Sequence, residues 1–189
     1  MLFRLIAALL LLLPVSQPVL AQDGIYAPPI PPPCRRVGDE PSLTIDPAIA
    51  GDLAKIGLDR AAIFERMRET SIPETMGCWA MPVGNFDSQL VSVGMAQWNY
   101  GTGSLQPVLK EWREAFGSKR EAKREIANLA PVYGKLLFSK DCLAVPVRQS
   151  CRDEILAAHG EDGKLNPVML GELTALFESN RMLQVQLDH

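Results

Sequence analysis

Two acidic residues, Glu74 and Asp87, stand in surroundings that would give their carboxyl groups different properties. Cleavage of a glycosidic bond needs one carboxyl group that stays protonated near neutral pH, and often a second one that is ionised. Glu74 follows Pro73 in a locally apolar stretch, and Trp79 would help to exclude water, which favours the protonated form. Asp87 lies among polar, turn-forming residues, which favour the ionised form. The pair predicts a general acid at Glu74 and a second carboxylate at Asp87.

The residues themselves leave an alternative open. Aspartate is also a common turn former that bonds its own backbone, which is a purely structural role for Asp87. With only two histidines, His159 and His189, the chain has little material for a Ser-His-Asp or Cys-His site. Carboxylate chemistry is therefore the catalytic class that the sequence favours, and it requires no cofactor.

Several short motifs around these carboxylates resemble the lysozyme-like superfamily. Glu74 precedes Gln97 by 23 positions, and a Ser-Val-Gly-Met-Ala-Gln run ends at that glutamine, as in soluble lytic transglycosylases. The segment from Asp87 to Gly94 is similar to a chitosanase hairpin. The set that resembles chitosanase-like proteins of this superfamily comprises Pro73-Glu74-Thr75, Cys78-Trp79-Ala80, Gly84-Asn85-Phe86-Asp87, Gln97-Trp98-Asn99 and Gly103-Ser104-Leu105-Gln106-Pro107.

The resemblance implies a mainly α (α+β) fold, a lysozyme-like helical domain with a small β-hairpin beside the active-site groove. It implies Glu74 as the general acid and Asp87 as the second carboxylate, and the longer acid-to-Asp separation of chitosanases makes Glu69 the alternative acid. No metal is expected, since no cysteine pair has C-x-x-C spacing. The residues expected to bind the glycan are Ser92, Gln97, Asn99, Trp98 and Tyr100, of which the two aromatic ones could stack on sugar rings. The implied substrate is peptidoglycan, cut by a lysozyme-type hydrolase or a lytic transglycosylase.

Departures from the family pattern keep a second interpretation open. Pro73 stands where the pattern has phenylalanine, and Ser88 and Leu90 stand where it has glycines, which removes backbone freedom. A non-catalytic, glycan-binding or structural protein of the envelope is therefore the alternative to an enzyme. Chitosan is the alternative substrate.

The first residues predict export. A basic residue, an apolar run and small residues ending at Ala21 are typical of a cleaved signal peptide over residues 1–21, which leaves no membrane span in the mature chain. We expect a periplasmic or secreted protein. Its four cysteines then favour disulfides: Cys142 with Cys151, which are close in sequence, and by elimination Cys34 with Cys78. Zinc binding is the competing interpretation of these cysteines.

Charge and composition set the remaining bounds. Without residues 1–21 the chain has 18 basic and 22 acidic side chains. This net negative charge does not favour binding to the phosphate backbone of a nucleic acid. Residues 22–40 form a proline-rich arm and residues 41–189 one domain. Within that domain we read the charged run from Lys119 to Glu125 as a solvated helix face.

Periodicity and capping residues predict a mainly helical domain. Asp46 and Asp59 are expected helix caps, Trp112 is expected in the core, and residues 82–94 are expected to form a hairpin or paired loop. Helices are expected over residues 60–70, 94–99, 104–116, 119–129, 131–138, 150–159 and 167–184.

Overall fold

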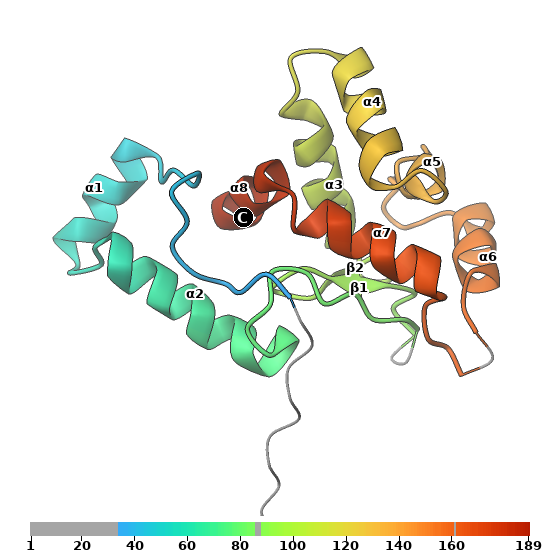
Figure 1. Cartoon of the computed structure of the whole chain (residues 1–189), viewed down its shortest axis with the longest axis horizontal. Helices are drawn as coiled ribbons and strands as arrows, with labels where there is room; N and C mark the ends of the chain where they lie inside the picture. Colours follow the sequence, from blue (N-terminus) through green and yellow to red (C-terminus); the bar gives the residue numbers. More distant parts are fainter. Residues whose placement is uncertain (1–33, 86–87, 161) are drawn as a thin grey trace, which may run out of the picture. The chain divides into compact units, whose positions relative to one another are not determined.

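The structure is a computed structural model that describes residues 34–85, 88–160 and 162–189 (Figure 1). The predicted signal peptide, most of the proline-rich arm and the predicted second carboxylate, Asp87, lie outside the described residues. No helix in the described ranges is both long and apolar enough to cross a bilayer.

The described residues form eight helices and one two-stranded antiparallel sheet, so the expectation of a mainly helical chain with a small hairpin is confirmed. In the sheet, Ser92 pairs with Asn99 and Val93 with Trp98. The elements are α1 (Pro47–Lys55), α2 (Arg60–Thr75), β1 (Ser92–Val93), β2 (Trp98–Asn99), α3 (Leu105–Glu114), α4 (Lys119–Leu129), α5 (Gly134–Leu137), α6 (Gln149–Ala157), α7 (Pro167–Phe177) and α8 (Asn180–Asp188).

Side-chain caps explain where several helices begin. Asp46 accepts hydrogen bonds from the backbone N–H groups of Ala48 and Ile49, and Asp59 accepts one from Ala62, so both predicted caps are confirmed. Such caps satisfy backbone donors that have no partner within the helix.

The predicted helix over residues 94–99 is wrong, because this segment is the turn and second strand of the hairpin. Gly94 has φ of 87° and Gln97 has φ of 51°, values that an α-helix does not allow. Residues 82–94 contribute β1 and an isolated bridge between Val83 and Ser92, so the expected pairing is partly found there. The local apolar spacing did not reveal these left-handed positions.

The predicted helix over residues 167–184 is two helices. The chain leaves the helix after Phe177, and the Ser179 hydroxyl then accepts a hydrogen bond from the Met182 N–H at the start of α8. The continuous apolar periodicity hid this break, because both helices bury a face in the same core.

Two hydrophobic clusters form the core. The larger one joins the hairpin to α3, α5, α6, α7 and α8, and it contains Trp112, whose predicted burial is confirmed. The smaller one joins the segment before α1 to α2 and α8 and consists of Val37, Leu43, Phe64, Trp79 and Leu183.

Two disulfides close the chain, Cys34–Cys78 and Cys142–Cys151, as predicted. The zinc interpretation is wrong, because all four cysteines are used in these bonds. Cys78 lies between α2 and the hairpin, so its disulfide holds the segment before α1 against the end of α2.

Candidate functional site

Helix α2 places Glu74 in its last turn, at the edge of the helix face that packs on the core. Phe64, Ser71 and Thr75 are the buried residues of α2. With about 3.6 residues per turn, Glu74 lies beside that buried face. Its side chain is nevertheless exposed, and among the described residues it has no hydrogen-bond or ion-pair partner. The expectation that apolar neighbours bury this carboxyl group is therefore wrong.

Trp79 does not shield Glu74 from water. The indole is fully buried in the smaller hydrophobic cluster, with Phe64 and Leu183, while the carboxylate stays in solvent. Between the two residues the chain leaves the helix through Met76, with φ of 53°, and Gly77, with φ of 81°, so Trp79 does not continue the helix that carries Glu74.

The segment after Glu74 is hydrogen-bonded to the hairpin through Ala80 and Met81. Gly94 donates a backbone hydrogen bond of 2.9 Å to the Ala80 oxygen, and the Gln97 amide donates to the Met81 oxygen at 3.1 Å. The helix end that carries Glu74 is thus followed by a chain that pairs with the motif residues of the hairpin. The structure brings these two parts of the sequence signature together.

Two of the five predicted glycan-binding residues are inaccessible. Ser92 is 3% exposed and Tyr100 is fully buried, with its hydroxyl donating to the Leu137 oxygen at 2.9 Å. Burial also raises the pKa of the Tyr100 phenol. Stacking of Tyr100 on a sugar ring and contact of Ser92 with substrate are therefore wrong for this structure, because both side chains belong to the core.

The other three are half-buried and have structural partners. The Gln97 amide bonds backbone oxygens, the Asn99 side-chain oxygen accepts from the Thr102 N–H and hydroxyl, and Trp98 forms a tilted ring contact with His189. These contacts shape the hairpin and its following turn. The exposed part of each side chain remains available to a ligand.

Glu69, the alternative acid, differs from Glu74 in place and partner. It lies on the side of α2 away from the buried face, and its carboxylate forms an ion pair with Arg66. Glu74, in contrast, has no ion pair among the described residues.

Four hollows on the described surface lie away from Glu74. They are lined by parts of α3, α4, α5, α6 and α8, by the segment before α1 and by Arg60 at the start of α2, and Glu74 lines none of the four. The groove expected beside Glu74 is not among them. Its other expected wall, Asp87, lies outside the described residues.

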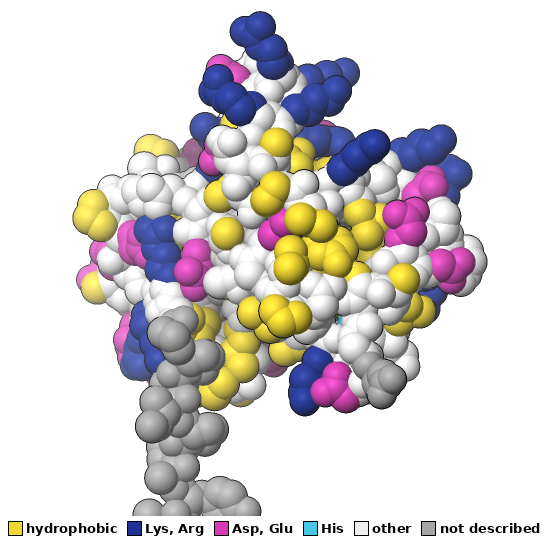
Figure 2. All heavy atoms as spheres, turned by 45° about the vertical axis from the view of Figure 1, so that its right-hand side comes forward, with side chains coloured by type: hydrophobic (Ala, Val, Ile, Leu, Met, Phe, Trp, Pro, Cys, Tyr) yellow, Lys and Arg dark blue, Asp and Glu magenta, His cyan; other side chains and the backbone are white. Residues whose placement is uncertain are grey.

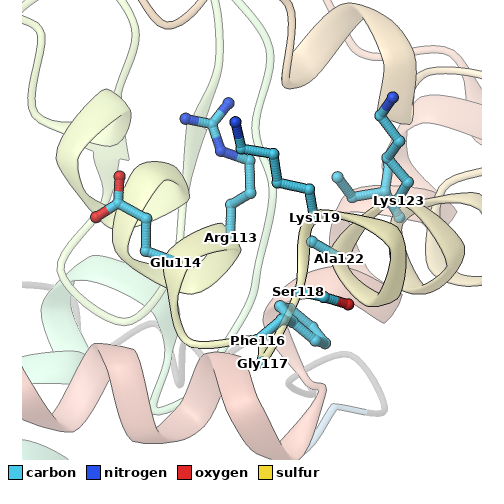
Figure 3. Close-up of a pocket in the computed structure, with 9 residues that line it drawn as sticks. Arg113, Glu114, Phe116, Gly117, Ser118, Lys119, Ala122 and Lys123 are labelled. Carbon is cyan, nitrogen blue, oxygen red and sulfur yellow. The ribbon is translucent and has the colours of Figure 1, made fainter.

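The hollow between the end of α3 and the start of α4 has a volume of ≈ 590 Å³ and a basic rim (Figure 3). Arg113, Lys119 and Lys123 line it together with the apolar side chains of Phe116 and Ile126. The sequence analysis did not identify this hollow, because it forms between two helices. Lys119 and Lys123, four residues apart on α4, are exposed, as expected for a solvated helix face.

Within the described ranges no group of three or more His, Cys, Asp and Glu side chains could hold a metal ion. Comparisons of this chain with protein family models, with curated proteins and with solved structures found no match.

Proposed function

We propose that this chain is an exported enzyme that cleaves glycosidic bonds in peptidoglycan, with Glu74 as the general acid. The observation that carries the proposal is the connection between the end of α2 and the hairpin, through Ala80–Gly94 and Met81–Gln97. This connection joins the segment that follows the exposed Glu74 to the hairpin that carries the polar and aromatic groups of β2. Two disulfides support export, since such bonds are typical of oxidising compartments.

A second function is favoured by the exposure of Glu74. A general acid in a glycosidase is normally kept protonated by apolar surroundings, and Glu74 has none covering it. The alternative is an exported protein of the cell envelope that binds glycan without cutting it. Chitosan stays the alternative substrate for the enzyme.

Purified peptidoglycan sacculi incubated with the exported form of the full chain test the first proposal. We expect soluble fragments from the unaltered protein and a loss of about 10²–10⁴-fold in their rate of release for Glu74→Gln, which is what removal of a general acid costs. Anhydro ends on the fragments would identify transglycosylation and reducing ends hydrolysis. Chitosan oligomers in a parallel incubation decide the substrate.

Two further variants of α2 make this test specific. Glu65→Gln is the matched control, because Glu65 is an exposed carboxylate of the same helix that pairs with Arg68. Glu69→Gln tests the alternative acid. A loss of activity in Glu69→Gln with full activity in Glu74→Gln would move the acid to Glu69. Co-sedimentation with sacculi without fragments from any form would establish the binding protein instead.

A further inference from the structure

Basic side chains are concentrated on one part of this acidic chain. Residues 34–77 contain six basic and eight acidic residues, whereas residues 105–152 contain ten basic and five acidic ones. Figure 2 shows Lys and Arg side chains gathered at the top of the view, over the α3–α4 region. The overall charge therefore conceals a local positive surface.

The charges of α4 are segregated by sign. Lys119 and Lys123 are four residues apart, and so are Glu121 and Glu125, so each pair of like charges shares a helix face. Like charges at this spacing repel and destabilise a helix. Within the described residues, Lys119 and Lys123 have no ion pair, although the same helix carries acidic residues.

Helix α2 shows the opposite arrangement. Glu65 pairs with Arg68 and Arg66 pairs with Glu69, each at a spacing of three residues. Opposite charges at this spacing stabilise a helix. The basic face of α4 therefore differs from α2 in having no such ion pairs at Lys119 and Lys123 within the described residues.

The basic face borders the hollow between α3 and α4. Arg113, at the end of α3, is a third cation without an ion pair among the described residues. In Figure 3 the side chains of Arg113, Lys119 and Lys123 extend toward the top of the view, and the acidic Glu114, which also lines the hollow, lies on the left. The half-buried apolar side chains of Phe116 and Ile126 also line the hollow, and its volume of ≈ 590 Å³ suits a small ligand.

We propose that this hollow binds a phosphate group carried on an apolar body. Arg113 would contact the phosphate through its planar guanidinium, which matches two phosphate oxygens, and the two lysines would neutralise the remaining charge. The first turn of α4 also borders the hollow. Its Glu121 N–H is bonded to the Ser118 hydroxyl, so the remaining backbone N–H groups of that turn would add the positive potential. Phe116 and Ile126 would contact the apolar body. This site contains none of the residues of the proposed glycan-cleaving site. A failed test of one proposal therefore leaves the other unaffected.

Isothermal titration calorimetry of the exported form of the full chain with n-octyl phosphate tests the site. n-Octyl glucoside, with the same chain and no charge, and inorganic pyrophosphate, with charge and no chain, are the matched ligands. We expect n-octyl phosphate to bind most tightly and n-octyl glucoside not to bind. Equal affinity for the glucoside, or no heat with n-octyl phosphate, would overturn the proposal.

A variant with Arg113→Gln, Lys119→Gln and Lys123→Gln should weaken the binding of n-octyl phosphate at least tenfold, because each lost cation removes a charge-assisted contact. The matched control carries Lys110→Gln, Arg120→Gln and Arg124→Gln, which removes the same charge from the same helices outside this hollow. The control should retain its affinity within about twofold. Equal losses of affinity in both variants would show that only the total charge matters and would contradict a specific site in the hollow.

Vesicles distinguish a membrane headgroup from a free phosphorylated molecule. Phosphatidylcholine vesicles with and without phosphatidic acid are sedimented with the protein and with both triple variants. Binding to the acidic vesicles that only the hollow variant loses identifies the headgroup as the source. Tight binding of n-octyl phosphate without vesicle binding identifies a free ligand, and circular dichroism of each variant confirms that it is folded.

Discussion

The Glu172 carboxylate, buried on α7, accepts a hydrogen bond of 2.7 Å from the backbone N–H of Tyr133, and its second oxygen accepts one of equal length from Val132. Glu172 is 7% exposed and is a buried acidic side chain with a structural role. It satisfies two backbone donors at the start of the turn that leads into α5. One side chain thus connects α7 to the segment after α4.

Glu172→Gln should destabilise the fold by about 1.5–3 kcal/mol, because hydrogen bonds to a charged acceptor are the stronger kind and an amide presents only one oxygen. The second backbone N–H would then face an NH₂ group and lose its partner. The free energy of unfolding in urea measures this loss. Glu114→Gln, an exposed glutamate on α3, is the control and should change stability by less than about 0.5 kcal/mol.

Tyr100→Phe separates a structural role from a glycan-binding one. The variant removes a fully buried hydroxyl and leaves the Leu137 oxygen without its donor, so we expect a loss of about 1–3 kcal/mol in unfolding free energy. Binding of the folded variant to sacculi should be unchanged. If Tyr100→Phe bound sacculi more weakly and had an unchanged free energy of unfolding, Tyr100 would contact glycan, and the burial of its side chain in the structure would be contradicted.

Tyr100 also predicts how stability depends on alkaline pH. Its buried phenol has a raised pKa, whereas the unfolded chain releases this proton near the ordinary value of 10.0. Above that pH the folded state holds more protons than the unfolded state. The contribution of Tyr100 is therefore complete below pH 10.0 and is lost as the pH rises, by at most about 1.4 kcal/mol per pH unit. Urea unfolding at about pH 9 and about pH 11 should show a smaller decline for Tyr100→Phe than for the unaltered protein.

The elements that local chemistry determines were predictable. Helix α4 spans the predicted residues because its cap, Ser118, and its helix-forming composition lie within the segment itself. The Cys142–Cys151 disulfide was predictable for the same reason, since its partners are nine positions apart. Both depend on residues that are neighbours in sequence.

The candidate site was harder to predict, because it depends on contacts between distant segments. Tyr100 is buried through a bond to Leu137, 37 positions away, and its own neighbours give no sign of that partner. Glu74 stands in an apolar stretch of sequence, but the helix turns its side chain outward while Trp79 turns into the core. The residues next to Glu74 in the sequence therefore gave a wrong prediction of the surroundings of its side chain.

The two disulfides should contribute unequally to stability. Cys34–Cys78 joins residues 44 positions apart and Cys142–Cys151 joins residues nine apart, so the first restricts the unfolded chain more. In the chain-entropy model, replacing both cysteines by alanine should cost about 4 kcal/mol for the first pair and about 2.7 kcal/mol for the second. Urea unfolding of the two double variants gives the comparison. A larger loss for Cys142–Cys151 would show that packing in the larger core, and not loop closure, dominates.

Gly94→Ala tests the turn that replaces the predicted helix. Gly94 has φ of 87°, and an added Cβ would lie 2.5 Å from the Trp98 ring and 3.0 Å from the Gln186 side-chain oxygen. That oxygen also accepts the Met95 backbone N–H, so a shift would disturb the contact between the hairpin and α8. We expect a loss of about 2–4 kcal/mol in unfolding free energy, from backbone strain and displaced side chains together.

Gly51→Ala is the control for this last variant. Gly51 lies inside α1 with nothing within 4 Å of an added Cβ, so alanine should stabilise the protein by about 0.5–1 kcal/mol through its better helix propensity. If residues 94–99 formed the helix that their sequence predicts, Gly94→Ala would also be stabilising. Opposite signs for the two glycines are therefore the result that only the hairpin explains.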